Sequence, residues 1–269
     1  MITATRAAGT VASATIAIVM PAHDEAEALP RVLAQIPRDL APRIVVVDNA
    51  STDGTADVAR RHGAEVVRAA RPGYGRACLA GIGYLAGSPP DILVILDADY
   101  SDYSEDLPLL LAPILAGKAD LVCGSRVERA EPAALGPHVR LGNALATGLI
   151  RLLFGFRYRD MGPFRAIRWE ALRRLEMRDL AYGWNAEMQV KALQRGLTVC
   201  EVQVRYRPRV GRSKISGTLR GTIGAGVGIL LMIVTLRLAP RWYARRVPRA
   251  TCFATADYAM SRLDFYRSL

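Results

Sequence analysis

The sequence predicts an α/β fold built on a doubly wound, mostly parallel sheet. Between residues 16 and 124, short apolar runs of strand length alternate with segments of helical length. This alternation is typical of βαβ units. Two of the apolar runs are followed directly by acidic residues, and ligands of doubly wound sheets bind beyond the carboxyl ends of the strands. The same pattern therefore predicts where a binding site lies.

The first half of the chain supplies five predicted strands and the helices between them. Four of the strands contain no charged residue, and the third in order is a short strand that includes Glu65 and Arg68. The predicted strands are Ile16–Met20, Ile44–Val47, Ala64–Arg68, Ile92–Leu96 and Leu121–Gly124. The predicted helices are Ala26–Ile36, Thr55–His62 (stopped by Gly63), Gly73–Leu85 and Glu105–Leu115.

The second half is less regular. Glu128–Pro137 is rich in Ala and Pro, which favours a flexible loop or lid. Helices are predicted at Arg140–Phe154, Trp169–Leu175 and Asn185–Arg195, and alternation predicts a strand at Thr198–Tyr206. We divide the chain into a flexible N-terminus (1–15), an α/β domain (16–217), an apolar segment (218–238) and a basic, poorly ordered tail (239–269).

The last quarter of the chain is both basic and apolar. From residue 201 onward there are 13 Lys and Arg against 3 Asp and Glu, a net charge of +10 out of +11 for the whole chain. The same region holds the uncharged stretch Gly221–Leu236, which lies between Arg220 and Arg237. It is shorter than the roughly 20 residues of a spanning helix. We predict a membrane-surface or re-entrant helix on an anionic membrane. A buried core helix and a solvated basic tail are the alternatives.

Several classes of protein are disfavoured by composition. Aromatic residues make up 7% of the chain and no recognition motif accompanies its basic residues, so nucleic acid is not the expected partner. No GxGxxG follows the first predicted strand, which argues against a dehydrogenase. We predict no signal peptide. The histidines form no metal pattern, and the cysteines have neither zinc nor redox spacing, which favours a reducing compartment.

The most informative feature of the chain is Asp97-Ala98-Asp99, directly after the strand Ile92–Leu96. Two carboxylates at positions i and i+2, just after a strand, can both point to the same place beyond the edge of the sheet. Their oxygens suit Mg²⁺ or Mn²⁺, a cation that usually takes phosphates as further ligands. A lone Asp there could be a turn former or helix cap. The pair, with Asp48 and Asp53 after the second strand, favours a nucleotide–metal site.

Six linked motifs follow one another along the chain: Met20–Glu25, Val47–Thr55, Asp97–Asp99, Gly124–Arg126, Asp160–Arg165 and Arg209–Lys214. In this order they resemble the family 2 inverting glycosyltransferases of the GT-A fold. The likeness is greatest to the polyprenyl-phosphate sugar transferases, the dolichol-phosphate mannosyltransferase group, and it extends to about Gly217. Each motif is weak alone; their combination is specific to the family and less specific to the acceptor.

The resemblance implies a nucleotide-diphosphate sugar as donor. Its base and ribose would contact Pro21, Ala22, Glu25, Asp48 and Asp53, and its diphosphate would contact Arg209, Ser213 and Lys214. Asp97 and Asp99 match the DxD motif, whose bound Mg²⁺ or Mn²⁺ bridges the two phosphates. Where close relatives carry Leu-Gln after this motif, the present chain has Tyr100-Ser101-Asp102. Ser101 is the positional match for the third metal ligand, and Asp102 is a possible substitute.

On the acceptor side the resemblance implies a polyprenyl phosphate, undecaprenyl or dolichyl. Asp160 and Asp99 would be the catalytic residues, Arg126, Arg140 and Arg165 would hold the acceptor phosphate, and Glu187 would lie near the sugar. A phosphate monoester arrives largely as a dianion, so Asp160 would then orient the acceptor or touch the metal. With a hydroxyl acceptor Asp160 becomes the candidate base.

The expected place of such an enzyme is the cytoplasmic face of the cell membrane, peripheral or re-entrant, in cell-envelope glycan synthesis. Two alternatives stay open. One is a family 2 enzyme with a glycan or lipid-hydroxyl acceptor. The other is a catalytically silent, membrane-docked protein that binds a nucleotide sugar.

Overall fold

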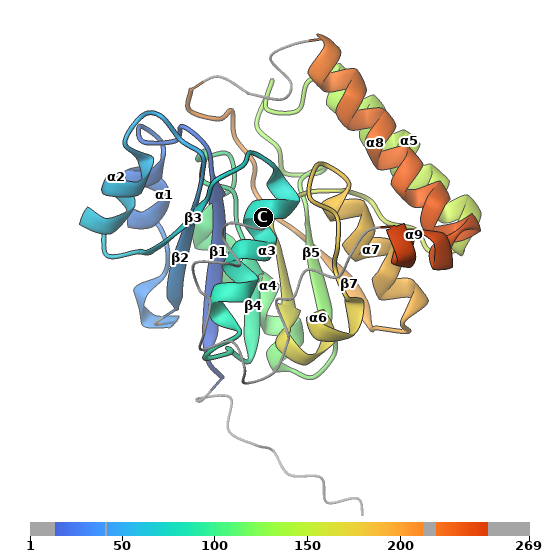
Figure 1. The fold of residues 1–269 in the computed structure, drawn as a ribbon, viewed down its shortest axis with the longest axis horizontal. Helices are drawn as coiled ribbons and strands as arrows, with labels where there is room; N and C mark the ends of the chain where they lie inside the picture. Colours follow the sequence, from blue (N-terminus) through green and yellow to red (C-terminus); the bar gives the residue numbers. More distant parts are fainter. Residues whose placement is uncertain (1–13, 41, 212–218, 247–269) are drawn as a thin grey trace, which may run out of the picture.

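A computed structural model describes residues 14–40, 42–211 and 219–246 (Figure 1). Seven strands form one sheet in the order β3-β2-β1-β4-β6-β5-β7. The strands are β1 (Ile16–Ala22), β2 (Arg43–Asn49), β3 (Glu65–Ala69), β4 (Ile92–Ile95), β5 (Leu121–Ser125), β6 (Arg165–Arg168) and β7 (Val199–Gln203). The sheet confirms the predicted α/β class with a mostly parallel arrangement.

One strand departs from the sequence prediction. β6 lies between β4 and β5 and runs antiparallel to both, with Arg165 opposite Ile95 on one side and Cys123 on the other. The sequence analysis assigned no strand to these residues. Because β6 runs the other way, the residues before it, not after it, reach the edge where the parallel strands end.

Helices cover both faces of the sheet. α1 (Leu29–Ala34), α2 (Thr55–Arg61) and α4 (Leu107–Leu115) pack on one face, whereas α3 (Tyr74–Leu85), α6 (Trp169–Leu175) and α7 (Trp184–Gln194) pack on the other. α5 (Pro137–Phe154), α8 (Leu219–Leu238) and α9 (Pro240–Arg246) extend the second layer outward. Two short 3₁₀ turns, η2 (Arg38–Leu40) and η3 (Ser104–Asp106), complete the elements.

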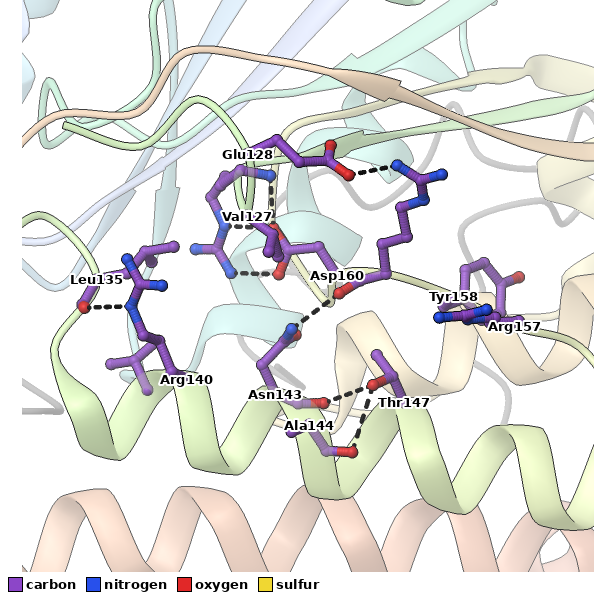
Figure 2. A pocket seen from close by; sticks show the side chains of 13 residues that line it. Val127, Glu128, Leu135, Arg140, Asn143, Ala144, Thr147, Arg157, Tyr158 and Asp160 are labelled. Atoms are coloured by element: carbon purple, nitrogen blue, oxygen red, sulfur yellow. Dashed lines mark hydrogen bonds and ion pairs between the residues drawn. The ribbon is translucent and has the colours of Figure 1, made fainter.

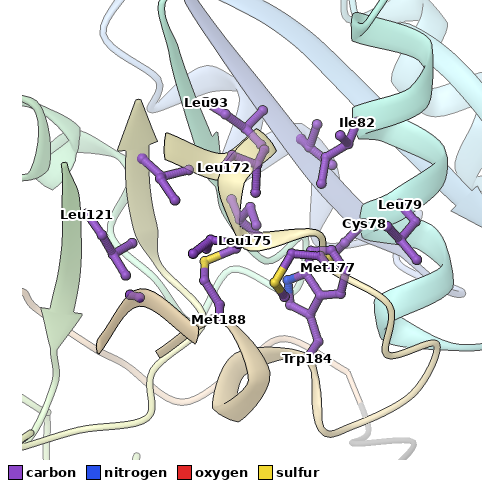
Figure 3. Close-up of a cluster of buried hydrophobic side chains, with 14 of the residues drawn as sticks. Cys78, Leu79, Ile82, Leu93, Leu121, Leu172, Leu175, Met177, Trp184 and Met188 are labelled. Atoms are coloured by element: carbon purple, nitrogen blue, oxygen red, sulfur yellow. The ribbon is translucent and has the colours of Figure 1, made fainter. Parts of the chain in front are cut away.

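The core is divided by the sheet into two apolar clusters. Alternate residues of each strand point to opposite faces, so Val19 and Leu93 belong to one cluster and Ile18 and Val94 to the other. Figure 3 shows part of the first cluster, where Trp184 and Met188 of α7 meet residues of α3 and α6. Burial on both faces explains why the parallel strands are continuous apolar runs.

The apolar C-terminal segment forms one helix with two different faces. α8 packs against α5, α7 and α9 and buries Ile233 and Leu236, while Val227 and Leu231 are exposed. The helix is therefore packed on the domain along one face, as the core-helix alternative expects, and the predicted contact of its exposed face with a membrane stays a prediction. Among the described helices, none has the length and apolar character needed to cross a membrane.

The two ends of the chain differ in part from the expected flexible segments. Thr15, assigned to the flexible N-terminus, bonds to the Asp91 carboxylate through its amide (2.7 Å) and its hydroxyl (2.8 Å). Residues 240–246, assigned to the poorly ordered tail, form α9. Residues 1–13 and 247–269 lie outside the described part.

Candidate functional site

The ends of β1, β2 and β4 face one cavity of about 280 Å³ at the carboxyl edge of the sheet. Pro21 and Ala22 end β1 and Glu25 follows it, Asn49 ends β2, and Asp97 to Asp99 follow β4. Residues 72–74, at the start of α3, form another wall of the cavity, and Tyr182 and Arg209 complete it from later parts of the chain. Its lining is Pro21, Ala22, His23, Glu25, Asn49, Pro72, Gly73, Tyr74, Asp97, Ala98, Asp99, Tyr182 and Arg209.

Asp97 and Asp99 place two carboxylates in this cavity. Burial, together with the neighbouring charge of Asp99, raises the pKa of Asp97 to about 7. The Tyr74 hydroxyl donates to Asp97 Oδ1 at 3.1 Å and partly opposes that shift. Confined like charges of this kind fit a hard divalent cation, which would relieve their repulsion and leave positions for phosphate oxygens. Among the described residues, no group of three or more His, Cys, Asp or Glu side chains is arranged as a metal site.

The turn after Asp99 fixes its orientation. Tyr100 has a positive φ of 68°, a strained conformation for a residue of this size. The Ser101 amide and hydroxyl both donate to Asp99 Oδ1, at 2.9 and 2.5 Å. Ser101, which the resemblance matched to a metal ligand, is buried and bonded to a metal-ligand candidate. Asp102 is also buried, and burial beside Asp97 and Asp99 raises the pKa of its carboxyl well above the usual range.

Arg209 reaches this cavity from the loop after β7. Its Nη2 lies 2.5 Å from Glu25 Oε1, and its Nη1 lies 3.3 Å from Asp99 Oδ2. The resemblance assigns this loop to the diphosphate of the donor, and that contact stays a prediction. Ser213 and Lys214, the other residues of the predicted loop site, lie outside the described residues.

Asp48 and Asp53 shape the neighbouring turn and do not line the cavity. The buried Asp48 carboxylate accepts from the Ser51 amide at 2.9 Å. Asp53 accepts from the amide and hydroxyl of Thr55 and from the Ala26 amide. Burial acts to raise the pKa of Asp53, but these hydrogen bonds outweigh it and lower the pKa. In this structure both carboxylates are occupied in holding the turn that carries Asn49.

A second cavity of about 770 Å³ lies between α5 and the loops that precede β6 and follow β5 (Figure 2). Arginines and apolar side chains share its walls: Val139 and Ala144 of α5 and Leu135 give the apolar part. Its charged lining comprises Arg126, Glu128, Arg140, Arg157, Arg159 and Asp160. Arg140 is exposed and donates to the Leu135 carbonyl at 3.1 Å.

Asp160 stands at the end of this cavity in a bidentate pair with Arg126. Arg126 Nε lies 2.7 Å from Oδ2 and Nη2 lies 2.8 Å from Oδ1, and the amides of Arg126 and Met161 donate to the same carboxylate at 2.9 and 2.7 Å. Burial opposes ionisation, but the charge and hydrogen bonds of Arg126 prevail and lower the pKa of Asp160. The charge of Arg126 also opposes the upward shift in the pKa of Asp97. The side chains at the two cavities therefore interact electrostatically.

Arg165 and Glu187, both assigned to the acceptor side, lie in the interior and border neither cavity. Arg165 is fully buried and donates to the carbonyls of Gly162, Pro163 and Asn185. It supports the loop that carries Asp160. Glu187 is fully buried in α7, where its carboxylate lies 2.6 Å from Lys191 Nζ.

Sequence reasoning missed the aromatic residues of the first cavity and two arginines of the second. Tyr74 lies between Gly73 and Gly75, and this pair of glycines at the start of a predicted helix was the available signal. Tyr182 gave no signal, because only the fold brings it to the same cavity as Tyr74. Arg157 and Arg159 precede the Asp160 motif directly, and their density there could have indicated an anion site.

A mostly parallel sheet with Asp97 and Asp99 facing a cavity at its carboxyl edge is the arrangement of a ligand-binding α/β domain. The family description "Glycosyl transferase family 2" matches residues 17–175, more than half of the chain. The chain belongs to glycosyl transferase family 2.

Individual proteins agree with this assignment. An uncharacterized glycosyltransferase of Mycobacterium tuberculosis is 43% identical over 79% of this chain and 95% of its own length. Undecaprenyl-phosphate mannosyltransferase of Micrococcus luteus is 32% identical over 85% of this chain and 96% of its own. The crystal structure of glucosyl-3-phosphoglycerate synthase from M. tuberculosis, with Mn²⁺, UDP-glucose and phosphoglyceric acid, superposes with a TM-score of 0.67 at 23% identity, covering 87% of this chain and 86% of that one. This last likeness concerns the fold.

Proposed function

We propose that this enzyme transfers a sugar from a nucleotide-diphosphate sugar to a polyprenyl phosphate, with inversion and with Mg²⁺ or Mn²⁺. The donor would occupy the 280 Å³ cavity and the acceptor phosphate the 770 Å³ cavity. In the reaction an acceptor phosphate oxygen bonds to the anomeric carbon while the bond from that carbon to the diphosphate breaks. The nucleoside diphosphate leaves with the electron pair.

The state of Asp160 is the observation that carries this choice of acceptor. A general base needs a free lone pair and a pKa near the working pH. Asp160 instead receives four hydrogen bonds, and its pKa is lowered. A hydroxyl acceptor would lack a base at this position. A phosphate monoester needs none, since it arrives largely as a dianion.

The second cavity also has the chemistry of a lipid phosphate site. Arg140, Arg157 and Arg159 are cations at its border, and guanidinium groups bind phosphate oxygens in a bidentate manner. The apolar residues of α5 offer a surface for the first isoprene units. The Micrococcus luteus relative, named for an undecaprenyl-phosphate acceptor, supports the same assignment.

On the donor side, the residues of the first cavity would bind and orient the diphosphate. Asp97 and Asp99 would hold the cation, which when bound supplies charge neutralisation at the departing diphosphate. Arg209 would add a positive charge at the same place, and Ser213 and Lys214 remain proposed partners of the diphosphate. Tyr74 holds Asp97 in place through its hydroxyl. Pro21 and Ala22 border the space left for the nucleoside.

We further propose that α5, α8 and α9 dock the enzyme on an anionic membrane at its cytoplasmic face. These helices pack together at one side of the molecule (Figure 1). They expose an apolar set: Leu141, Leu145, Leu152, Val227, Leu231, Leu238 and Trp242. The sequences of these three helices contain arginines but no Asp, Glu or Lys. Apolar side chains among cations favour an anionic lipid surface.

The acceptor assignment is tested with labelled UDP- and GDP-sugars, Mn²⁺, and two matched acceptors, a polyprenyl phosphate and the corresponding polyprenol. We expect label in the organic phase with the phosphate and none with the alcohol. Transfer to the polyprenol alone would contradict the proposal and point to a hydroxyl acceptor. Nucleotide binding without transfer to any acceptor would indicate the catalytically silent alternative.

A further inference from the structure

Glu187 is a buried carboxylate that joins three separate parts of the chain. It has no exposed surface. Oε1 accepts from Lys191 Nζ at 2.6 Å and from the Tyr243 hydroxyl at 3.0 Å. The Arg178 and Asp179 amides donate to the carboxylate at 3.0 and 2.8 Å. Because a buried charge is costly unless it is paired and bonded, these contacts fix one arrangement of α7, α9 and residues 178–179.

The short helix α9 is held at a second point beside the first. Arg178 Nη1 donates to the Ala244 carbonyl at 2.8 Å, and the Arg178 side chain is buried. The Tyr243 ring is buried too, with the Lys191 ammonium 5.5 Å from its centre. Burial and the Glu187 charge raise the pKa of the Tyr243 hydroxyl, so it remains a donor. We call Glu187, Lys191, Arg178 and Tyr243 the α7–α9 network.

The segment next to this network is seated on the N-terminus of α3. The Gly75 and Arg76 amides donate to the carbonyls of residues 181 and 180, both at 3.1 Å. The approach is so close that a Cβ added at Gly73 or Gly75 would lie 2.4 or 2.1 Å from a carbonyl oxygen of residues 179–180. Glycine at these two positions is what allows the two backbones to touch.

Both segments border the donor cavity. Tyr74 follows Gly73, lines the cavity and donates its hydroxyl to Asp97. Tyr182 lines the cavity from the other segment. A continuous set of hydrogen bonds and close contacts therefore runs from α9 through residues 178–182 to the carboxylate that we assign to the metal.

We propose that Glu187 and Tyr243 are positioning residues for the donor site. By holding residues 178–182 against α3, they set the place of Tyr74 and Tyr182 in the cavity, although neither touches the donor. The part of this inference that concerns donor binding rests on the proposed function. The positioning itself does not.

The test is Tyr243→Phe, which removes one hydroxyl and keeps the buried ring. Hydrogen exchange followed by mass spectrometry measures the amides of residues 73–76 and 178–182, and calorimetry measures the binding of UDP and GDP with Mn²⁺. A hydrogen bond to a charged group is worth about a tenfold change in an equilibrium. We expect amide exchange in both segments to accelerate about tenfold. We also expect the dissociation constant of whichever nucleotide the native enzyme binds to rise about tenfold.

Tyr84→Phe is the matched control. It removes the bond from the Tyr84 hydroxyl to Glu65 Oε2, 2.8 Å long, at the other end of α3. The control should leave both measurements unchanged. Equal effects in the two variants, or no effect in Tyr243→Phe, would overturn the inference, as would faster exchange with unchanged nucleotide affinity. If the native enzyme binds neither nucleotide, the proposed function is contradicted, and the exchange result alone then supports or overturns the positioning.

Discussion

Mn²⁺ binding should weaken steeply as the pH falls below 7, because one of its two carboxylate ligands is easily protonated. Burial and the charge of Asp99 raise the pKa of Asp97 to about 7. The cation must displace that proton, so each pH unit below 7 reduces the apparent affinity about tenfold. At pH 5.5 the dissociation constant should therefore be about thirtyfold higher than on the plateau above pH 8, and about fifteenfold higher than at pH 7, where the carboxyl is half protonated. Above pH 7.5 it should be nearly constant.

Electron paramagnetic resonance of free Mn²⁺, titrated with nucleotide-free protein from pH 5.5 to 8.5, measures this dependence. A plot of log Kd against pH should bend near pH 7, where Asp97 begins to be protonated. Tyr74→Phe removes a hydrogen bond that lowers the pKa of Asp97, so this bend should move to higher pH. Asp97→Asn, which keeps an acceptor oxygen for Tyr74, should bind Mn²⁺ weakly, and the bend near pH 7 should be lost. Asp57→Asn, a change on the exposed side of α2, is the control. An affinity that is independent of pH in the native protein would refute the reasoning.

The other predictions concern stability, turnover and membrane binding. Without metal, the raised pKa of Asp97 stabilises the fold at low pH, and this contribution is lost as the pH rises through about 7, so Asp97→Asn should reduce the fall in Tm between pH 5 and 8; an identical fall in both proteins would contradict this. Asp99→Asn should lower turnover at least about 100-fold, the scale of losing one preorganised charged group, and near-normal metal-dependent activity would exclude it as a ligand. Arg209→Ala should raise the KM for the donor, and unchanged kinetics would leave the 209–214 loop without a role in binding. Asp160→Asn should cost about 3–5 kcal/mol of folding free energy, seen as a lower Tm, because it leaves the buried Arg126 without its charge partner; an unchanged Tm would argue against the pair. The double variant Leu152→Glu, Leu231→Glu should float less with anionic vesicles than the native protein, whereas Leu109→Glu on α4, across the sheet, should float as the native protein does. Equal flotation of the native protein, the double variant and the Leu109→Glu control would remove the docking role of α5 and α8.

The parallel part of the sheet was predictable from sequence because its strands are buried on both faces. A run such as Ile92–Leu96 carries its own signal, and the acidic residues behind it mark the carboxyl edge. β6 gave no such signal. Its four residues include Arg165 and Arg168, and it is a strand only because β4 and β5 leave a position between them. A short strand with charged side chains is decided by tertiary pairing.

The candidate site was predictable as a set of residues but not as a set of contacts. Arg126 and Asp160 were both named from motifs, yet nothing in the sequence showed that they pair with each other. The network of Glu187 was likewise hidden, since it joins α7 to Tyr243 in a segment that was expected to be poorly ordered. Motifs indicate the residues that carry chemistry, and only the fold shows which of them neutralise one another.

The antiparallel strand β6 also has a consequence for how the chain assembles. β4 and β5 do not pair with each other, because each pairs with β6, which follows α5 in the chain. The sheet is therefore complete only after residues 165–168 have inserted between the two strands. Before that insertion, each of the two strands presents an open row of amide and carbonyl groups. Open edges of apolar strands are templates for pairing with other chains. Ala166 and Ile167 are fully buried, so substitutions there should lower the stability and also the yield of refolding, and the loss of yield should grow with protein concentration because aggregation does. Refolding at two protein concentrations measures this directly.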